Sequence, residues 1–256
     1  MNMRTQQDEA IIVRNLSKHF KGSRAVIDVS FSVNKGEVFG LLGPNGAGKT
    51  TTVECITGAL KPDDGHITVL GVDPTQTRQF VRERVGYQMQ TSTLPASLRV
   101  EEALDLYASF YASPARVADL LDAIGLMPHR NRPFGRLSGG QKQRLSIALA
   151  LIGTPDIVVL DELTTGVDPE GRRDVWRLVE GFNDQGITFI LVSHDLDEID
   201  RLCDRFAIIA DGRTRFVGTS DELLRRYPAQ SPSRWALEDS YVAFLDEARQ
   251  TEGTIP

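Results

Sequence analysis

The sequence predicts an α/β fold with a parallel sheet at its centre, and two observations lead to that prediction. Three apolar runs without alternation, residues 157–160, 188–192 and 206–210, are typical of strands buried on both faces, as in parallel sheets. Segments with helical periodicity separate these runs. The 256 residues are 41% hydrophobic, which provides enough apolar side chains to fill the core of such a fold.

The first third of the chain is predicted to be rich in strands. Strand patterns occur at residues 11–13, 26–33 and 38–42. Apolar residues alternate within 26–33, which indicates that one face of this strand is packed. Turn signals at residues 34–36 and 62–65 mark the ends of these elements.

The pattern becomes helical between about residues 91 and 136. It predicts a helix over residues 100–111 and a second helix that starts at Ser113-Pro114 and stops at Gly125. Further on, Asp211-Gly212 is predicted to be a hairpin turn, and an amphipathic helix is expected from about residue 234 to 249.

Residues 43–50 read Gly-Pro-Asn-Gly-Ala-Gly-Lys-Thr, which is the Gly-x-x-x-x-Gly-Lys-Thr pattern of a loop that wraps nucleotide phosphates. The strand predicted at 38–42 precedes it, and residues 51–57 continue as a helix closed by Gly58. The glycines let successive backbone N–H groups converge on phosphate oxygens at the positive end of that helix. The alternative is a glycine-rich turn before an ordinary helix, and the Lys-Thr ending disfavours it.

The phosphate loop is therefore predicted to bind a nucleotide. Lys49 supplies a point charge for the outer phosphates and is assigned to the catalytic set, while the Thr50 hydroxyl is suited to ligating Mg²⁺. Thr51 can reach an inner phosphate. The predicted binding residues of the loop are Gly43, Pro44, Asn45, Gly46, Ala47, Gly48, Lys49, Thr50 and Thr51.

A second signal is Leu137-Ser138-Gly139-Gly140-Gln141, at the start of a helix predicted to run to about Leu151. Ser138 and Gln141 can form a capping box. Two glycines in a first turn are poor helix formers, so something is expected to approach that backbone closely, and a γ-phosphate would do so. Together with the phosphate loop, this five-residue signature resembles the ATP-binding subunits of ABC transporters, over nearly the whole chain.

The resemblance implies a more detailed architecture. It implies an α/β fold with a P-loop NTPase core and parallel sheet, an N-terminal antiparallel β subdomain and a helical insertion subdomain. The chain then divides into residues 1–90 (β subdomain and phosphate-loop part of the ATPase core), 91–136 (helical insertion), 137–226 (the rest of the core, with the signature helix) and 227–256 (C-terminal helical tail).

The resemblance also implies partners. In the family, the signature of one subunit faces the phosphate loop of another across a head-to-tail dimer, so Ser138, Gly139, Gly140 and Gln141 are expected to contact ATP in trans. Asp168 matches an aspartate at the dimer contact, and it can also cap the helix that Pro169 begins. The expected partners are a second nucleotide-binding subunit, identical in the simplest case, and a separately encoded integral-membrane permease.

The apolar run 157–160 ends in two adjacent carboxylates, Asp161 and Glu162. The resemblance assigns Asp161 to Mg²⁺ and Glu162 to the attacking water. His194 follows another predicted strand and matches a histidine that contacts the γ-phosphate. Taken alone, the two acids could simply end a strand in solvent, and a single histidine is usually structural.

Two further assignments depend on the resemblance. Gln90 matches a glutamine that touches Mg²⁺ and links the core to the helical insertion, with Gln88 as its rival. Phe20 lies where the family places an aromatic ring against adenine, although a core phenylalanine would look the same. The family usually has proline where this chain has Leu163, and Val167 replaces a common leucine.

Charge and hydropathy limit the possible partners and location. A formal net charge of −6 and a pI near 5.3 argue against a nucleic-acid binder. No apolar run approaches the roughly 18 residues that span a bilayer, and the first ten residues lack the apolar stretch of a secretory signal. We expect a cytoplasmic protein that is peripheral on the inner face of the cell membrane through its permease.

These features predict an ATPase that powers transport, with export suggested by segments that look like those of drug, antibiotic or lipid exporters, residues 163–169 and 236–240. A soluble ABC-type ATPase is the alternative. Thr50 and Ser138 are 88 positions apart, which leaves no room for the long coiled coil of chromosome-associated relatives. A GTPase would need Asn-Lys-x-Asp after the phosphate loop, which is absent from the sequence. The sequence does not name the cargo.

Overall fold

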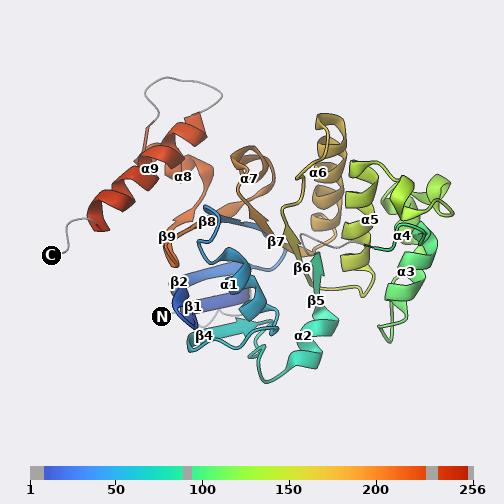
Figure 1. The fold of residues 1–256 in the computed structure, drawn as a ribbon, viewed down its shortest axis with the longest axis horizontal. Coiled ribbons are helices and arrows are strands. Elements are labelled where there is room, and N and C mark those ends of the chain that lie inside the picture. Colours follow the sequence, from blue (N-terminus) through green and yellow to red (C-terminus); the bar gives the residue numbers. More distant parts are fainter. Residues whose placement is uncertain (1–8, 89–93, 229–235, 253–256) are drawn as a thin grey trace.

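The computed structural model of the chain describes residues 9–88, 94–228 and 236–252. Within them, nine strands form one sheet in the order β4-β1-β2-β9-β8-β3-β7-β6-β5 (Figure 1). Helices pack against this sheet, so the predicted α/β class is confirmed.

The N-terminal part of the sheet is antiparallel. It contains β1 (Glu9–Phe20), β2 (Ser23–Asn34) and β4 (Asp64–Val69), with β1 in the middle. Val29, Phe31 and Val33 of β2 are buried, which is the packed face that the alternation predicted.

The centre of the sheet is parallel, as predicted. Its strands are β3 (Val38–Leu42), β5 (Val85–Gln88), β6 (Ile157–Asp161), β7 (Thr188–Ser193) and β8 (Arg205–Ala210). A turn at Asp211-Gly212 joins β8 to the antiparallel β9 (Arg213–Gly218), which confirms the predicted hairpin. The carboxyl ends of β3, β6 and β7 meet at one edge, where open α/β sheets bind their ligands.

Both faces of this parallel region are covered, which explains why its strands lack alternation. Ile157 and Val159 of β6 belong to a core shared with α1 (Lys49–Ile56) and the antiparallel strands. Val158 and Leu160 belong to a second core on the opposite face. The second core includes residues of α5 (Gly139–Leu151), α6 (Pro169–Asn183) and α7 (Leu196–Leu202).

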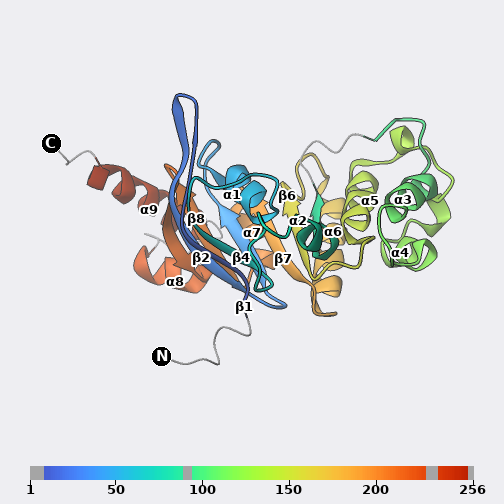
Figure 2. The same ribbon diagram turned by 90° about the horizontal axis from the view of Figure 1, so that it is seen from below.

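The remaining helices lie mainly at the two ends of the molecule. Together with α5, helices α3 (Val100–Ala108) and α4 (Val117–Ala123) occupy one end, whereas α8 (Ser220–Arg226) and α9 (Ala236–Glu252) occupy the other (Figures 1 and 2). Shorter elements are α2 (Arg78–Arg84), η2 (Met127–His129) and η3 (Phe134–Arg136). None of the helices in the described ranges is long and apolar enough to span a bilayer.

Two predicted helix boundaries differ from the structure. The helix expected to reach residue 111 ends at Ala108, and the helix expected from Ser113-Pro114 begins at Val117. The intervening chain packs on the C-terminal end of α5. A Cβ atom added at Gly153 would lie 2.3 Å from the Tyr111 ring, and the Ala115 N–H donates to the Ile152 carbonyl at 2.8 Å. These tertiary contacts replace the helical hydrogen bonds that periodicity alone suggested.

Candidate functional site

The glycines of the phosphate loop hold conformations that need glycine. Gly43, Gly46 and Gly48 have positive φ values of 156°, 80° and 102°. A Cβ atom at Gly43 would lie 2.0 Å from the Ile209 carbonyl oxygen, and one at Gly48 would lie 2.5 Å from the Ala25 carbonyl oxygen. The loop is therefore curled tightly against its neighbours, and the first N–H groups of α1 are left without carbonyl partners in their own helix.

Lys49 lies across the loop that precedes it. Its Nζ atom donates hydrogen bonds to the carbonyl oxygens of Gly43 at 2.7 Å and Pro44 at 3.0 Å. Burial lowers the pKa of Lys49, and the charges of Asp161 and Glu162 oppose that shift. The ammonium group is thus held between the loop and two carboxylates, where the outer phosphates of a nucleotide would lie.

A pocket of about 470 Å³ opens beside Lys49. It joins the phosphate loop to the carboxyl ends of β6 and β7 and to the start of β2. The lining residues are Arg24, Ala25, Asn45, Gly46, Gly48, Lys49, Thr50, Thr51, Asp161, Glu162, Val192 and Ser193. Donors suited to phosphate oxygens therefore lie near the hydroxyl and carboxylate oxygens that Mg²⁺ prefers, so the residues fit both a nucleotide and its cation.

Asp161 and Glu162 end β6 in different surroundings. Asp161 is only 6% exposed; burial and the charge of Glu162 raise the pKa of Asp161, against the opposing effect of Lys49. Glu162 has a left-handed backbone with φ of 51°, which is a strained conformation for a residue with a side chain. Its N–H donates to the Val192 carbonyl at 2.9 Å, which ties this strained turn to the end of β7.

His194 lies next to Glu162. Its Nδ1 atom is 3.5 Å from Glu162 Oε1, and the Thr165 hydroxyl is 3.4 Å from the other carboxylate oxygen. The His194 side chain is 55% exposed, whereas that of Glu162 is 19% exposed. The structure therefore brings Glu162, which lines the pocket, into contact with His194, which is not among the lining residues.

The signature segment opens α5 outside the lining of the pocket. Gln141 N–H donates to Ser138 Oγ at 3.3 Å, and Ser138 N–H donates to Gln141 Oε1 at 3.0 Å, so the predicted capping box is confirmed. Gly140 is buried, and a Cβ atom there would lie 3.3 Å from Gly171 Cα of α6. Close packing of α5 on α6 thus explains why residue 140 is a glycine, whereas Ser138 and Gly139 are exposed.

Asp168 caps α6, as predicted. Its Oδ1 atom accepts hydrogen bonds from the N–H groups of Glu170 at 3.1 Å and Gly171 at 3.0 Å, and Pro169 is the first helical residue. This cap fixes the loop that follows Glu162 to the start of α6.

Phe20, predicted from the resemblance, is not among the residues that line the pocket, and neither are Gly43, Pro44 and Ala47 of the phosphate loop. Phe20 ends β1 with 48% exposure, and Lys18 Nζ lies 5.9 Å from the centre of its ring. Gln90 lies outside the described residues. Its rival Gln88 is 5% exposed within β5, and its Oε1 atom has no hydrogen-bond partner in the part of the chain that the structure describes.

The residues of this site also match a known family. The sequence model of the family described as "ABC transporter" matches residues 26–165. The chain is 40% identical over 226 residues to the daunorubicin/doxorubicin resistance ATP-binding protein DrrA of Streptomyces peucetius, an alignment that covers 86% of this chain and 68% of that protein. The chain belongs to the ABC transporter family.

Two further similarities agree with this identification. Nod factor export ATP-binding protein I of Burkholderia orbicola (strain AU 1054) is 37% identical over 250 residues, with 93% of this chain and 81% of that protein covered. A solved ATP-binding subunit of an ABC transporter superposes with a TM-score of 0.80 at 29% identity, covering 92% of this chain and 99% of that one. The chain is therefore an ABC transporter ATP-binding subunit and an ATPase.

This ABC transporter subunit departs from the usual family pattern at Leu163. The Leu163 side chain is fully buried in the core beneath α5 and α6. Leucine gains apolar burial there, but it does not fix φ as proline does. The conformation of the chain after Glu162 must therefore be held by contacts rather than by a ring.

Sequence patterns missed four pocket residues, Val192 and Ser193 at the end of β7 and Arg24 and Ala25 at the start of β2. Arg24 adds a positive charge to the lining, and the Ala25 carbonyl crowds Gly48. No motif marks Arg24 and Ala25. They could have been recognised only by their position after Phe20, across a short hairpin turn in which His19 pairs with Arg24.

We expect Asp161→Asn to raise the thermal unfolding midpoint of the nucleotide-free protein near neutral pH. Because the pKa of Asp161 is raised, the folded protein binds this proton more tightly than the unfolded chain does, so the ionised carboxylate lowers the free energy of unfolding as pH rises through the folded pKa. The neutral amide removes that cost.

Differential scanning calorimetry of parent and variant measures the unfolding midpoint. Asp156→Asn is the matched control, because it removes a 40% exposed carboxylate that pairs with Arg84. The control should not raise the midpoint. An Asp161→Asn variant that is less stable than its parent without nucleotide would contradict the prediction.

Proposed function

We propose that this ABC transporter subunit uses MgATP to close a head-to-tail dimer and thereby drives export through a separate membrane subunit. One observation carries the proposal: the phosphate loop, Asp161 and Glu162 line one pocket, whereas the exposed Ser138 and Gly139 lie outside it. Each chain then supplies the phosphate-loop half of one site and the signature half of another. A second nucleotide-binding subunit, identical in the simplest case, completes both.

Within this proposal, each site residue has its own role in ATP binding or hydrolysis. Thr50 and Asp161 would hold Mg²⁺, with Gln90 as a further expected ligand, and the ion would supply positive charge against the negative charge of the phosphates. Glu162 orients the attacking water and takes its proton, while His194 and Lys49 contact the γ-phosphate. Phe20 stacks on adenine, and the in-trans contacts come from Ser138, Gly139, Gly140, Gln141 and Asp168.

The direction of transport is inferred from relatives. One is named for Nod factor export and another for daunorubicin/doxorubicin resistance. Export, as the exporter-like segments at residues 163–169 and 236–240 suggest, would agree with these names. The subunit would then work in the cytoplasm, held at the inner face of the membrane by its permease.

A groove of about 610 Å³ supports the proposal of a membrane partner. It lies between the end of α1, α2, β5 and the chain after α3. Phe110, 69% exposed, and Tyr111 supply apolar surface, while the positive charges of Arg78 and Arg82 outnumber the negative charge of Glu83 in the lining. Such a groove suits a short amphipathic helix that carries acidic residues.

We expect the ATPase rate of the purified subunit to change about 5-fold or more when the membrane chain encoded beside it is added in vesicles, the usual size of coupling between sites. Phe110→Asp should abolish that response and leave the rate of the free subunit unaltered, because Phe110 lies in the groove and not in the nucleotide pocket.

Leu106→Asp is the matched control for this experiment. Leu106 is 47% exposed on α3 but does not line the groove, so its variant should still respond. Indifference of the unmodified subunit to the membrane chain would contradict the transport proposal and favour a soluble ABC-type ATPase.

A further inference from the structure

A carboxylate that the proposed chemistry does not use is buried behind the site. Glu198, in α7, is 1% exposed. Burial raises the pKa of its carboxyl, and hydrogen bonds from Ser193 and Thr164 oppose that shift. A buried carboxylate is costly unless its oxygens accept hydrogen bonds, so its partners show what it holds.

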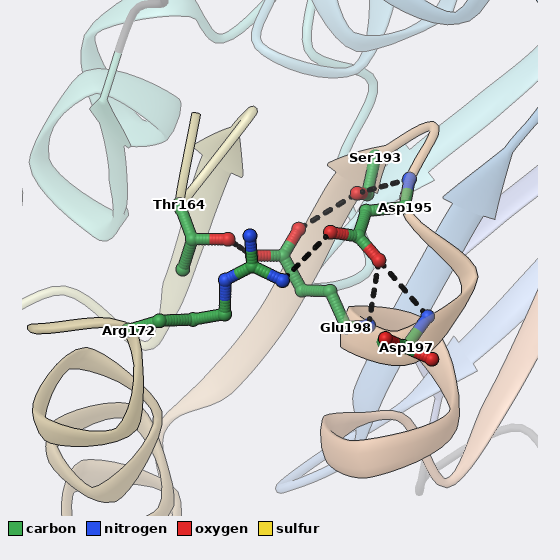
Figure 3. Close-up of polar contacts among 6 residues, drawn as sticks. All are labelled: Thr164, Arg172, Ser193, Asp195, Asp197 and Glu198. Carbon is green, nitrogen blue, oxygen red and sulfur yellow. Dashed lines mark hydrogen bonds and ion pairs between the residues drawn. The ribbon is translucent and has the colours of Figure 1, made fainter. Parts of the chain in front are cut away.

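The two partners come from different segments (Figure 3), and each lies within two residues of a predicted catalytic residue. The Thr164 hydroxyl donates to Glu198 Oε1 at 2.8 Å, and the Ser193 hydroxyl donates to Oε2 at 2.7 Å. Thr164 lies two residues after Glu162, and Ser193 directly precedes His194. One carboxylate therefore joins the turn that carries Glu162 to the turn that carries His194.

A second contact joins the same two segments. Arg172 of α6 lies 3.2 Å from Asp195 Oδ2, and Asp195 caps α7 by accepting from the N–H groups of Asp197 and Glu198 (Figure 3). The loop from Thr164 to Asp168, expected at the dimer contact, is thus anchored to α7 at its start and through α6 just beyond its end. Leu163 leaves the backbone there freer than the usual proline would, so the conformation of this loop depends more strongly on these contacts.

We propose that Glu198 is a positioning residue for ATP hydrolysis, which keeps Glu162 and His194 in register by accepting a hydrogen bond from the segment next to each. The inference rests on the roles proposed above for Glu162 and His194. The same contacts would couple dimer closure to ATP hydrolysis. Movement of the 164–168 loop on closure would shift the Glu198 carboxylate, which also holds the turn that carries His194.

The test compares Thr164→Val with Thr164→Ser in the full chain. Thr164→Val removes the hydroxyl at nearly constant shape, and we expect kcat to fall about 5- to 100-fold, since a misplacement of about 1 Å at reacting groups can cost roughly 100-fold. The KM for ATP should stay within about two-fold, because the phosphate loop is untouched. Thr164→Ser keeps the hydroxyl and should recover most of the lost kcat.

Thr75→Val is the matched control. It removes a hydroxyl–carboxylate hydrogen bond of 2.7 Å, to Asp73, that lies outside the nucleotide pocket. Its kcat should equal that of the parent even if its unfolding midpoint falls. Ser193→Ala is the second variant, and it should lower kcat as Thr164→Val does; the double variant should lose less than the product of the two, because both act through Glu198.

A kcat that falls less than about five-fold in both single variants, equal losses in Thr164→Val and Thr164→Ser, or a loss explained by KM would each overturn the proposal. Glu162→Gln is measured alongside as the reference. If Glu162→Gln is inactive while Thr164→Val and Ser193→Ala are not impaired, the positioning role fails and the proposed function stands. If Glu162→Gln is also unimpaired, the role of Glu162 itself fails.

Discussion

Glu162→Gln should slow ATP turnover by roughly 10² to 10⁴-fold, the usual contribution of a positioned acid or base. The amide keeps the size and most of the contacts of the side chain but cannot take a proton from water. Two features of the site support this choice of residue: Glu162 lines the nucleotide pocket, and its carboxylate lies 3.5 Å from His194. ATP binding should survive, because the phosphate loop and Lys49 are unchanged.

Slow turnover should also make the ATP-bound dimer accumulate. Sedimentation velocity with MgATP is therefore expected to show dimers of Glu162→Gln at concentrations where the parent is largely monomeric. Glu238→Gln is the matched control, since Glu238 is exposed on α9, which lies at the end of the molecule opposite α3 and α4. Near-normal turnover of Glu162→Gln would remove Glu162 from its role, and monomers at saturating MgATP would contradict dimer closure.

Features that depend on short-range patterns could be predicted from the sequence. The strand, glycine loop and helix around Lys49 follow one another within a few residues, and the structure has them in that order. The capping box at Ser138 requires only a partner three residues later, and it formed. The adjacent acids at the end of β6 were recognised because an apolar strand ends there.

Features that depend on distant contacts could not be predicted. The helix that begins at Val100 stops early because Tyr111 packs on Gly153, a residue in the turn after α5. Gly140 seemed to require an approaching phosphate, yet Gly171 of α6 already accounts for part of that requirement. No sequence pattern singles out Glu198, because its hydroxyl partner Thr164 is 34 residues away. Local spacing contains no information on such pairs.

Lys49→Ala should weaken ATP binding by about 1.5 to 3 kcal/mol, the usual contribution of a hydrogen bond to a charged group, or roughly 10- to 150-fold in Kd. The lysine contributes a charge close to the outer phosphates. It also donates to the carbonyl oxygens of Gly43 and Pro44, so its loss removes a contact that stabilises the loop itself. Isothermal titration calorimetry measures the change, with Lys61→Ala as the control for loss of an exposed charge outside the pocket.

The two contributions of Lys49 can be separated by the choice of nucleotide. A lost contact with the outer phosphates should weaken ATP far more than AMP, which lacks those phosphates. A loop that collapses without its lysine should weaken both nucleotides equally, because the whole phosphate-binding surface is then disturbed. We expect the first outcome, since the positive φ values of Gly46 and Gly48 and the close approach of Ala25 hold the loop independently of the side chain. An unchanged affinity for ATP would instead exclude Lys49 from the phosphate site.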